Sequence, residues 1–76
     1  MATIEIRLFA NLAAKSPSNS QAYIIEPGTS VGELLHGLQV SPNEAKLIFV
    51  DGVRSNLNTS LMGGERVGIF PPVGGG

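Results

Sequence analysis

The stretch TSVGELLHGLQV, residues 29–40, constrains the fold most, because it is the clearest helix in the sequence. Its apolar residues recur at i, i+3, i+4 and i+7 and so form one stripe: Val31, Leu34, Leu35 and Leu38. Ser30 and Glu33 have the spacing of a capping box, in which each side chain accepts a hydrogen bond from the other residue's backbone N–H. Gly32 and Gly37 each weaken the helix by about 1 kcal/mol relative to alanine. This helix therefore needs a sheet to pack against.

The remaining sequence has the alternation and the turn signals of short strands. TIEIRLF, residues 3–9, alternates apolar and polar side chains, which predicts a strand with one buried face. Further strands are predicted at residues 22–26, 46–50, 53–55 and 66–70, with turns at Pro27-Gly28 and Asp51-Gly52. Residues 10–21 are predicted to form a loop with at most one helical turn. Residues 55–65 are predicted to form a polar connection with buried anchors at Leu57 and Leu61.

One helix and several strands predict a two-layer α+β domain. The order of the elements suits a β-grasp (ubiquitin-like) fold, a mixed sheet of four to five strands with one main helix across one face. In this arrangement the first and last strands lie side by side. We expect residues 1–76 to form a single domain, with residues 70–76 as a flexible, extended C-terminal tail.

Composition excludes several classes of function. Five basic and six acidic residues are spread without a basic stripe, so we expect no nucleic-acid partner. No apolar run reaches the length of a signal peptide or of a bilayer span, so we expect no membrane association. The absence of cysteine excludes disulfides and thiolate metal sites, and it fits a cytoplasmic protein.

The body of the sequence contains no recognisable catalytic set. His36 is the only histidine, it lies off the apolar stripe of the helix, and no cysteine or second histidine completes a metal site. The carboxylates have structural uses: Glu5 faces outward, Glu33 caps the helix and Asp51 makes a turn. We therefore expect no bound metal or cofactor, and no enzymatic activity of the isolated chain.

The ending FPPVGGG is the remaining place for chemistry. Pro71 and Pro72 end the last strand and stiffen the segment after it, because proline has a fixed φ and donates no backbone hydrogen bond. The residues beyond Phe70 reach on the order of 20 Å from the domain. Val73 offers one apolar contact, and residues 74–76 carry no side chain. Such a segment passes through a narrow channel and presents its carboxylate unhindered, whereas the alternative is an ordinary frayed terminus.

Three segments resemble the MoaD/ThiS family of sulfur carriers, which are ubiquitin-like β-grasp proteins. They are LFANLA near the start, TSVGELL at the helix, and L-x-x-G-E-R-V-x-I-F-P-P-V-x-G-G at the end. The ending is closest to that of the molybdopterin synthase small subunit. Against the family pattern, Glu65 and Asp51 replace the more usual Asp and Asn, and residues 11–21 are shorter and more polar than in the molybdopterin branch.

The resemblance implies that Gly76 is adenylated by a ubiquitin-activating-type adenylyltransferase, which uses ATP with Mg²⁺, and is then converted to a thiocarboxylate. A larger synthase subunit would receive the tail, and the sulfur would pass to a pterin precursor of the molybdenum cofactor. The implied partner-binding residues are Phe70, Pro71, Pro72, Val73, Gly74 and Gly75. Thiamine thiazole or amino-acid biosynthesis stays open as the destination, as do a ubiquitin-like protein modifier and a non-covalent binding module.

Strand alternation also predicts a docking patch. Val67 and Ile69 face the helix, so Phe70 points to the open face of the sheet. Phe9 is out of phase with the buried positions of its strand in the same way, and Phe49 is a further candidate. Exposed aromatic residues beside the tail are typical of a partner-binding surface. For Phe9 and Phe49, filling a small satellite core is the equally weighted alternative.

Overall fold

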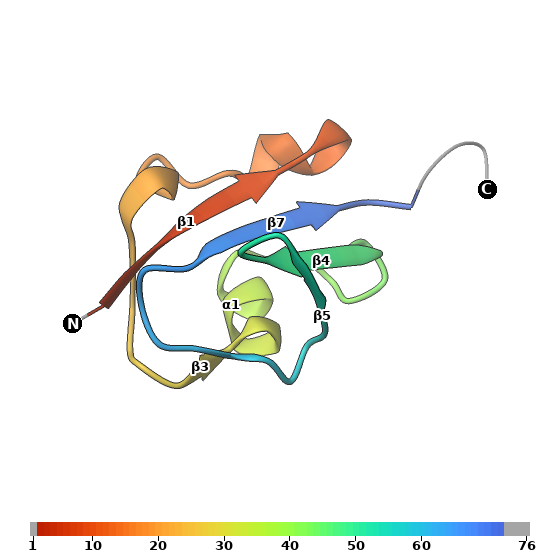
Figure 1. The fold of residues 1–76 in the computed structure, drawn as a ribbon. Coiled ribbons are helices and arrows are strands. Elements are labelled where there is room, and N and C mark those ends of the chain that lie inside the picture. Colours follow the sequence, from red (N-terminus) through yellow and green to blue (C-terminus); the bar gives the residue numbers. More distant parts are fainter. Residues whose placement is uncertain (1, 73–76) are drawn as a thin grey trace.

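The computed structural model describes residues 2–72. Its main feature is a five-stranded mixed sheet in the order β2-β1-β7-β4-β5, with one α-helix against one face (Figure 1). The elements are β1 (Ala2–Leu8), η1 (Ala10–Lys15), η2 (Ser20–Ala22), β2 (Tyr23–Ile25), β3 (Thr29–Ser30), α1 (Val31–Gly37), β4 (Leu47–Val50), β5 (Val53–Ser55), β6 (Ser60–Leu61) and β7 (Arg66–Phe70). This is the predicted α+β, β-grasp arrangement.

The first and last strands pair as predicted. β1 runs parallel to β7, with Ile6 opposite Val67 and Leu8 opposite Ile69. β7 is therefore the central strand, and on its other side it pairs antiparallel with β4. Asp51 and Gly52 both have positive φ, 53° and 81°, as a two-residue hairpin turn between β4 and β5 requires.

The core lies between the sheet and α1. The inward positions of the strands and the apolar stripe of the helix fill it, as alternation and helical spacing predict. Fifteen residues form this buried cluster, among them Ile4, Ile6, Val31, Leu34, Leu35, Leu61, Val67 and Ile69. The predicted capping box is present: Ser30 Oγ accepts from the Glu33 N–H at 3.1 Å, and Glu33 Oε1 accepts from the Ser30 N–H at 2.9 Å.

Several segments differ from the sequence-based prediction. α1 ends at Gly37, so the buried residues Leu38 and Val40 belong to the segment after the helix and not to the helix itself. The predicted loop 10–21 contains two short 3-10 helices, η1 and η2, and Leu12 of η1 is only 1 % exposed. Leu61 is a buried anchor as predicted, whereas Leu57 is half-buried against the core.

A two-stranded sheet formed by β3 and β6 was not predicted. Thr29 pairs with Leu61 and Ser30 with Ser60, so the residue that caps α1 is also part of a strand pair. The pairing is extended by the Val31 N–H, which donates to the Thr59 carbonyl at 2.9 Å. It links the start of the helix to a segment about thirty residues away, a contact that local sequence patterns do not encode.

Candidate functional site

The last residues of the described chain leave the sheet at the end of its central strand. Phe70 pairs with Leu47 of β4, and its carbonyl accepts a hydrogen bond from the Lys46 N–H at 2.9 Å. Pro71 is half-buried and Pro72 is exposed, and neither has an N–H to extend the sheet. The other predicted site residues, Val73, Gly74, Gly75 and Gly76, lie outside the described residues.

Three phenylalanines meet on the open face of the sheet beside this strand end. Phe9 and Phe70 stack, with ring centroids 4.1 Å apart and an interplanar angle of 2°. Phe49 meets Phe70 edge to face, with centroids 5.8 Å apart and an angle of 84°. All three side chains are half-buried rather than enclosed in a satellite core. The predicted aromatic patch is therefore present and includes Phe9 and Phe49.

Phe9 reaches this position because the backbone continues past β1 along the central strand. The Phe9 N–H donates to the Ile69 carbonyl at 3.1 Å, which keeps Phe9 in register with Phe70. Alternation along β1 then directs Phe9 away from the face that buries Leu8. Phe49 shares the face because it lies opposite Gly68 in the antiparallel pairing of β4 with β7.

One row of residues crosses the open face from strand to strand. Arg7 of β1 is opposite Gly68 of β7, Gly68 is opposite Phe49 of β4, and Phe49 is opposite Arg54 of β5. An open pocket of about 360 Å³ lies over the first part of this row. Its lining consists of the three phenylalanines, Gly52, Gly68, and the side chains of Arg7 and Arg66.

Glu5 holds the two arginines of this lining. Its carboxylate accepts a hydrogen bond from Nε of Arg7 at 3.0 Å and lies 3.5 Å from Nε of Arg66. The hydrogen bond from Arg7 and the charge of Arg66 outweigh partial desolvation and lower the pKa of the Glu5 carboxyl below its ordinary value of 4.5. Both guanidinium groups remain well exposed, with 62 % of the Arg7 side chain and 69 % of the Arg66 side chain accessible.

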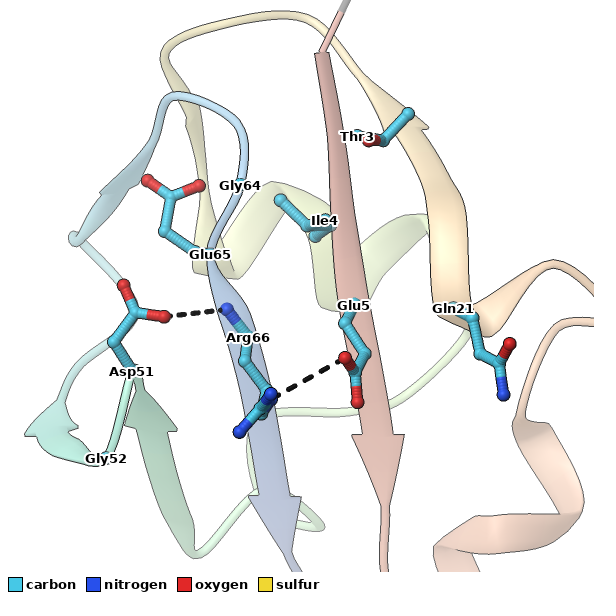
Figure 2. A pocket seen from close by; sticks show the side chains of 9 residues that line it. All are labelled: Thr3, Ile4, Glu5, Gln21, Asp51, Gly52, Gly64, Glu65 and Arg66. Atoms are coloured by element: carbon cyan, nitrogen blue, oxygen red, sulfur yellow. Dashed lines mark hydrogen bonds and ion pairs between the residues drawn. The ribbon is translucent and has the colours of Figure 1, made fainter.

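A second, more polar pocket of about 500 Å³ shares Arg66 with the first and is lined also by Glu5, Asp51 and Glu65 (Figure 2). Two carboxylates of its lining, those of Asp51 and Glu65, accept hydrogen bonds from backbone N–H groups. Asp51 accepts from the Arg66 N–H at 3.0 Å, and Glu65 accepts from the Met62 and Gly63 N–H groups at 2.8 and 2.7 Å. These contacts account for the acidic side chains as structural groups, as the sequence patterns predict for Asp51.

His36 is exposed on α1, as its position off the apolar stripe predicts. Within residues 2–72, no three His, Asp or Glu side chains gather in a way that could hold a metal ion. In the same part of the chain, no helix has the length and apolar character needed to cross a bilayer.

The row around Gly68 was not predicted from the sequence, although the phenylalanines were. Alternation alone puts Arg7, Gly68 and Arg66 on the open face, which is a usable signal. Their adjacency depends on the register between β1, β7 and β4, which pairs residues about sixty positions apart in β1 and β7 and about twenty positions apart in β4 and β7. A shift by one residue would move every side chain to the opposite face.

The sequence matches one family among known proteins. A family model for the ThiS family matches residues 6–76. No relative among curated proteins matches the sequence.

Several solved structures share the fold. Small archaeal modifier protein 1 of Haloferax volcanii is 22 % identical with a TM-score of 0.76, over 96 % of this chain and 100 % of that one. The HVO 2177 protein of the same organism is 23 % identical with a TM-score of 0.76, over 99 % and 87 %. A chain of the complex between subunits 1 and 2 of the molybdopterin-converting factor of Helicobacter pylori is 25 % identical with a TM-score of 0.54, over 97 % and 99 %.

Proposed function

This chain belongs to the ThiS family, and from that premise we propose that it is a sulfur carrier whose reactive group is the carboxylate of Gly76. The observation that carries the proposal is the family match, which extends through the glycine tail to residue 76. In the described part of the chain, Glu33 caps α1, and Asp51 and Glu65 accept hydrogen bonds from backbone N–H groups, so these three carboxylates have structural contacts.

The chemistry takes place in two steps on a partner enzyme. A ubiquitin-activating-type adenylyltransferase, using ATP with Mg²⁺, joins an oxygen of the Gly76 carboxylate to the α-phosphorus and releases pyrophosphate. A sulfur donor at the sulfide level then displaces AMP, which leaves a thiocarboxylate. The absence of side chains at Gly74 and Gly75 keeps the approach to this carbonyl clear. Because activation uses ATP, we place it in the cytoplasm.

The open face of the sheet and the two prolines after it position the tail for binding to its partners. Pro71 and Pro72 come directly after the central strand, whose last carbonyl is held by Lys46, so the tail starts from a fixed point. Phe70, together with Phe9 and Phe49, offers a half-buried aromatic surface beside that point. Aromatic side chains in such positions are frequent anchors of protein interfaces. We assign docking to Phe70, Pro71, Pro72 and Val73, and passage into the partner's site to the glycines.

The destination that we favour is a molybdopterin-synthase-type complex, in which the chain acts as the small, sulfur-donating subunit. The PPV-x-GG ending and the similarity to a chain of the two-subunit Helicobacter pylori complex support this choice. A thiamine thiazole synthase or an amino-acid synthase would use the same thiocarboxylate. Binding of the thiocarboxylated chain to each purified candidate subunit separates these destinations.

Intact mass spectrometry tests the carrier chemistry. Incubation with the activating enzyme, ATP, Mg²⁺ and a sulfide source should raise the mass of the chain by the difference between sulfur and oxygen. Deletion of residues 75–76 should abolish the change while leaving the circular dichroism spectrum intact, and omission of ATP is the matched control. An unchanged mass with every ubiquitin-activating-type enzyme of the source organism would refute the proposal.

A ubiquitin-like protein modifier is the second candidate. It is favoured by the likeness to small archaeal modifier protein 1, which extends over the whole of that chain. In this case an ε-amino group of a target lysine attacks the activated Gly76 carbonyl and forms an isopeptide bond. An epitope-tagged chain expressed in its source organism should then give ladders of conjugates that disappear when residues 75–76 are deleted. The carrier function predicts a single unconjugated species.

A further inference from the structure

Lys46 lies beside the point at which the C-terminal tail begins. Its backbone N–H donates to the Phe70 carbonyl at 2.9 Å, and the next residue, Leu47, pairs with Phe70 across β4 and β7 (Figure 1). The Lys46 side chain itself is exposed. The sheet therefore holds the base of this side chain next to the strand end from which residues 71–76 continue.

Lys15 and Lys46 are the only lysines of the sequence, and the structure distinguishes their ammonium groups. Lys15 Nζ donates to the Gln39 carbonyl at 2.6 Å and to Glu44 Oε1 at 3.1 Å. Lys46 Nζ makes no hydrogen bond or ion pair with any group of residues 2–72. Both lysines lie at the same end of the sheet, since Glu44 is two residues from Lys46. The amine of Lys46 is thus the one without a competing contact in the described part of the chain.

The segment beyond Phe70 is long enough to return to this amine. Its six residues span on the order of 20 Å when extended, and a lysine side chain adds about 6 Å. Pro71 and Pro72 keep the first part of the segment extended. Residues 74–76 are glycines, and glycine adopts the backbone conformations of a tight reversal at no steric cost. A link between residue 76 and Lys46 therefore requires no change in the described sheet.

The covalent connection also makes an encounter between these two groups frequent. Two groups joined by a short flexible segment meet at an effective concentration on the order of millimolar. An amine on a second copy of the chain, at a protein concentration of about 10 μM, is roughly a hundredfold more dilute. Reaction within one molecule is therefore favoured over reaction between two molecules.

We propose that Lys46 is an internal acylation site, at which the adenylated Gly76 of the same molecule forms an intrachain isopeptide bond. The inference rests on the proposed adenylation of Gly76 and gives that intermediate a second fate. The neutral ε-amino group of Lys46 attacks the carbonyl carbon of the acyl-adenylate. The new N–C bond forms as the C–O bond to AMP breaks, AMP leaves with the electron pair of that bond, and the nitrogen releases one proton to solvent. The ATP used for adenylation supplies the driving force.

The product is a closed ring that cannot carry sulfur. Residue 76 then has no free carboxylate, so the chain is neither adenylated again nor converted to a thiocarboxylate. The sulfide-level donor and the Lys46 amine compete for the same carbonyl carbon. Ring closure therefore withdraws chains that are activated while the sulfur donor is lacking.

Intact mass spectrometry distinguishes the two fates of Gly76. The full chain is incubated with the ubiquitin-activating-type adenylyltransferase, ATP and Mg²⁺, once with a sulfide source and once without it. With sulfide we expect the thiocarboxylate, and without sulfide we expect a monomer that is lighter by one water molecule. Thiocarboxylate in the first reaction with no dehydrated monomer in the second would overturn this inference and leave the carrier function standing. An unchanged mass in both reactions would overturn both.

Digestion of the dehydrated monomer with trypsin locates the new bond. Trypsin cleaves after an unmodified lysine, so an isopeptide bond at Lys46 blocks that cleavage and joins residues 16–54 to residues 67–76 in one branched peptide. A bond to Lys15 or to the α-amino group would overturn the choice of Lys46. Two chains joined with the loss of one water molecule, in place of the dehydrated monomer, would show reaction between molecules and would also overturn the inference.

Two arginine substitutions complete the test. Lys46→Arg removes the amine but keeps the charge and the backbone N–H that binds Phe70, and it should reduce the dehydrated monomer by about tenfold or more. Lys15→Arg is the matched control and should leave its amount unchanged. Circular dichroism checks that each variant is folded, and the reaction with sulfide checks that it is activated. Undiminished dehydration in Lys46→Arg would refute the proposal. If Lys46→Arg is not activated, the branched peptide of the unaltered chain decides.

Discussion

At the scale of single residues, Phe70 joins the fold to the proposed function. Its backbone is the last paired position of the central strand, and its ring contacts both Phe9 and Phe49. The neighbouring residues Val67 and Ile69 are fully buried on the other face. The inward neighbours thus secure the strand, and the outward ring remains accessible to a partner.

Replacement of Phe70 by serine should separate these two roles. We expect Phe70→Ser to destabilise the domain by about 1–3 kcal/mol, because the ring loses its stacking and its partial burial. Because small domains are stable by about 5–15 kcal/mol, the variant should remain folded. Binding to the activating enzyme should fall at least tenfold, as measured by calorimetry. An unchanged Kd would argue against the aromatic patch as the docking surface.

At Gly63 both the backbone conformation and the space around it favour glycine. Its φ is 124°, and a Cβ there would lie 2.7 Å from Cβ of Ala2. We expect Gly63→Ala to destabilise the domain by about 1–3 kcal/mol because of strain in an unfavourable backbone region. This corresponds to a fall in Tm of roughly 4–8 °C per kcal/mol. Gly37→Ala serves as control, and an equal Tm for both variants would contradict the assignment.

At the scale of elements, the start of α1 depends on two independent devices. The capping box of Ser30 and Glu33 satisfies backbone N–H groups of the first turn. The pairing of β3 with β6 holds the same residues from outside the helix. A seven-residue helix is too short to be stable alone, so its position depends on these contacts and on the sheet.

Removal of the cap should therefore weaken the helix without abolishing it. Ser30→Ala is expected to cost about 0.5–2 kcal/mol, the usual effect of losing a serine N-cap. Urea unfolding monitored by circular dichroism measures it. Ser30→Asp keeps a capping oxygen and should retain most of the stability. A loss as large in Ser30→Asp as in Ser30→Ala would point to the β3–β6 pairing instead.

The 3-10 helix η1 contributes to the core through Leu12, which is 1 % exposed. Leu12→Ala should destabilise the domain by about 2–5 kcal/mol, because the lost burial adds to the cost of a cavity. The neighbouring exposed Ala13→Ser should have an effect within about 0.5 kcal/mol. Equal unfolding midpoints in urea for these two variants would show that η1 is not part of the cooperative unit.

At the scale of the whole molecule, two carboxylates connect distant segments through charge. Glu5 holds Arg7 and Arg66 on adjacent strands, and Glu44 connects η1 to the segment after the helix. The Ser41 N–H, and after it the ammonium of Lys15, lowers the pKa of the Glu44 carboxyl below 4.5. The hydrogen bond from Arg7 lowers the pKa of the Glu5 carboxyl in the same direction.

These pKa shifts predict acid sensitivity. A carboxyl group whose pKa is lower in the folded state binds protons more readily in the unfolded chain, so it favours folding at higher pH. The contribution is present above pH 4.5 and is lost as the pH falls through the lowered folded values. Glu5→Gln with Glu44→Gln should lower the Tm at neutral pH and reduce its fall on acidification. Melting curves across this range test it, and parallel curves for both proteins would contradict it.

Local patterns in the sequence were sufficient for much of the fold. Alternation in residues 3–9 and 66–70 predicted the buried faces of β1 and β7, and Ser30 with Glu33 predicted the start of the helix. Asp51-Gly52 predicted its turn. Each of these features depends on residues within a few positions of one another, and side-chain direction and backbone sterics determine them directly.

The tertiary structure alone decided which distant residues share a surface. The β3–β6 pair, the burial of Leu12 and the row of Arg7, Gly68, Phe49 and Arg54 all join segments far apart in the chain. Their register results from packing the whole core, where a slip by one residue would expose every buried side chain of a strand. The sequence by itself therefore determined the start of the main helix, the strands of the five-stranded sheet with their buried faces, and the outward direction of Phe70. Non-local packing determined the pocket over Gly68 and its arginine rim.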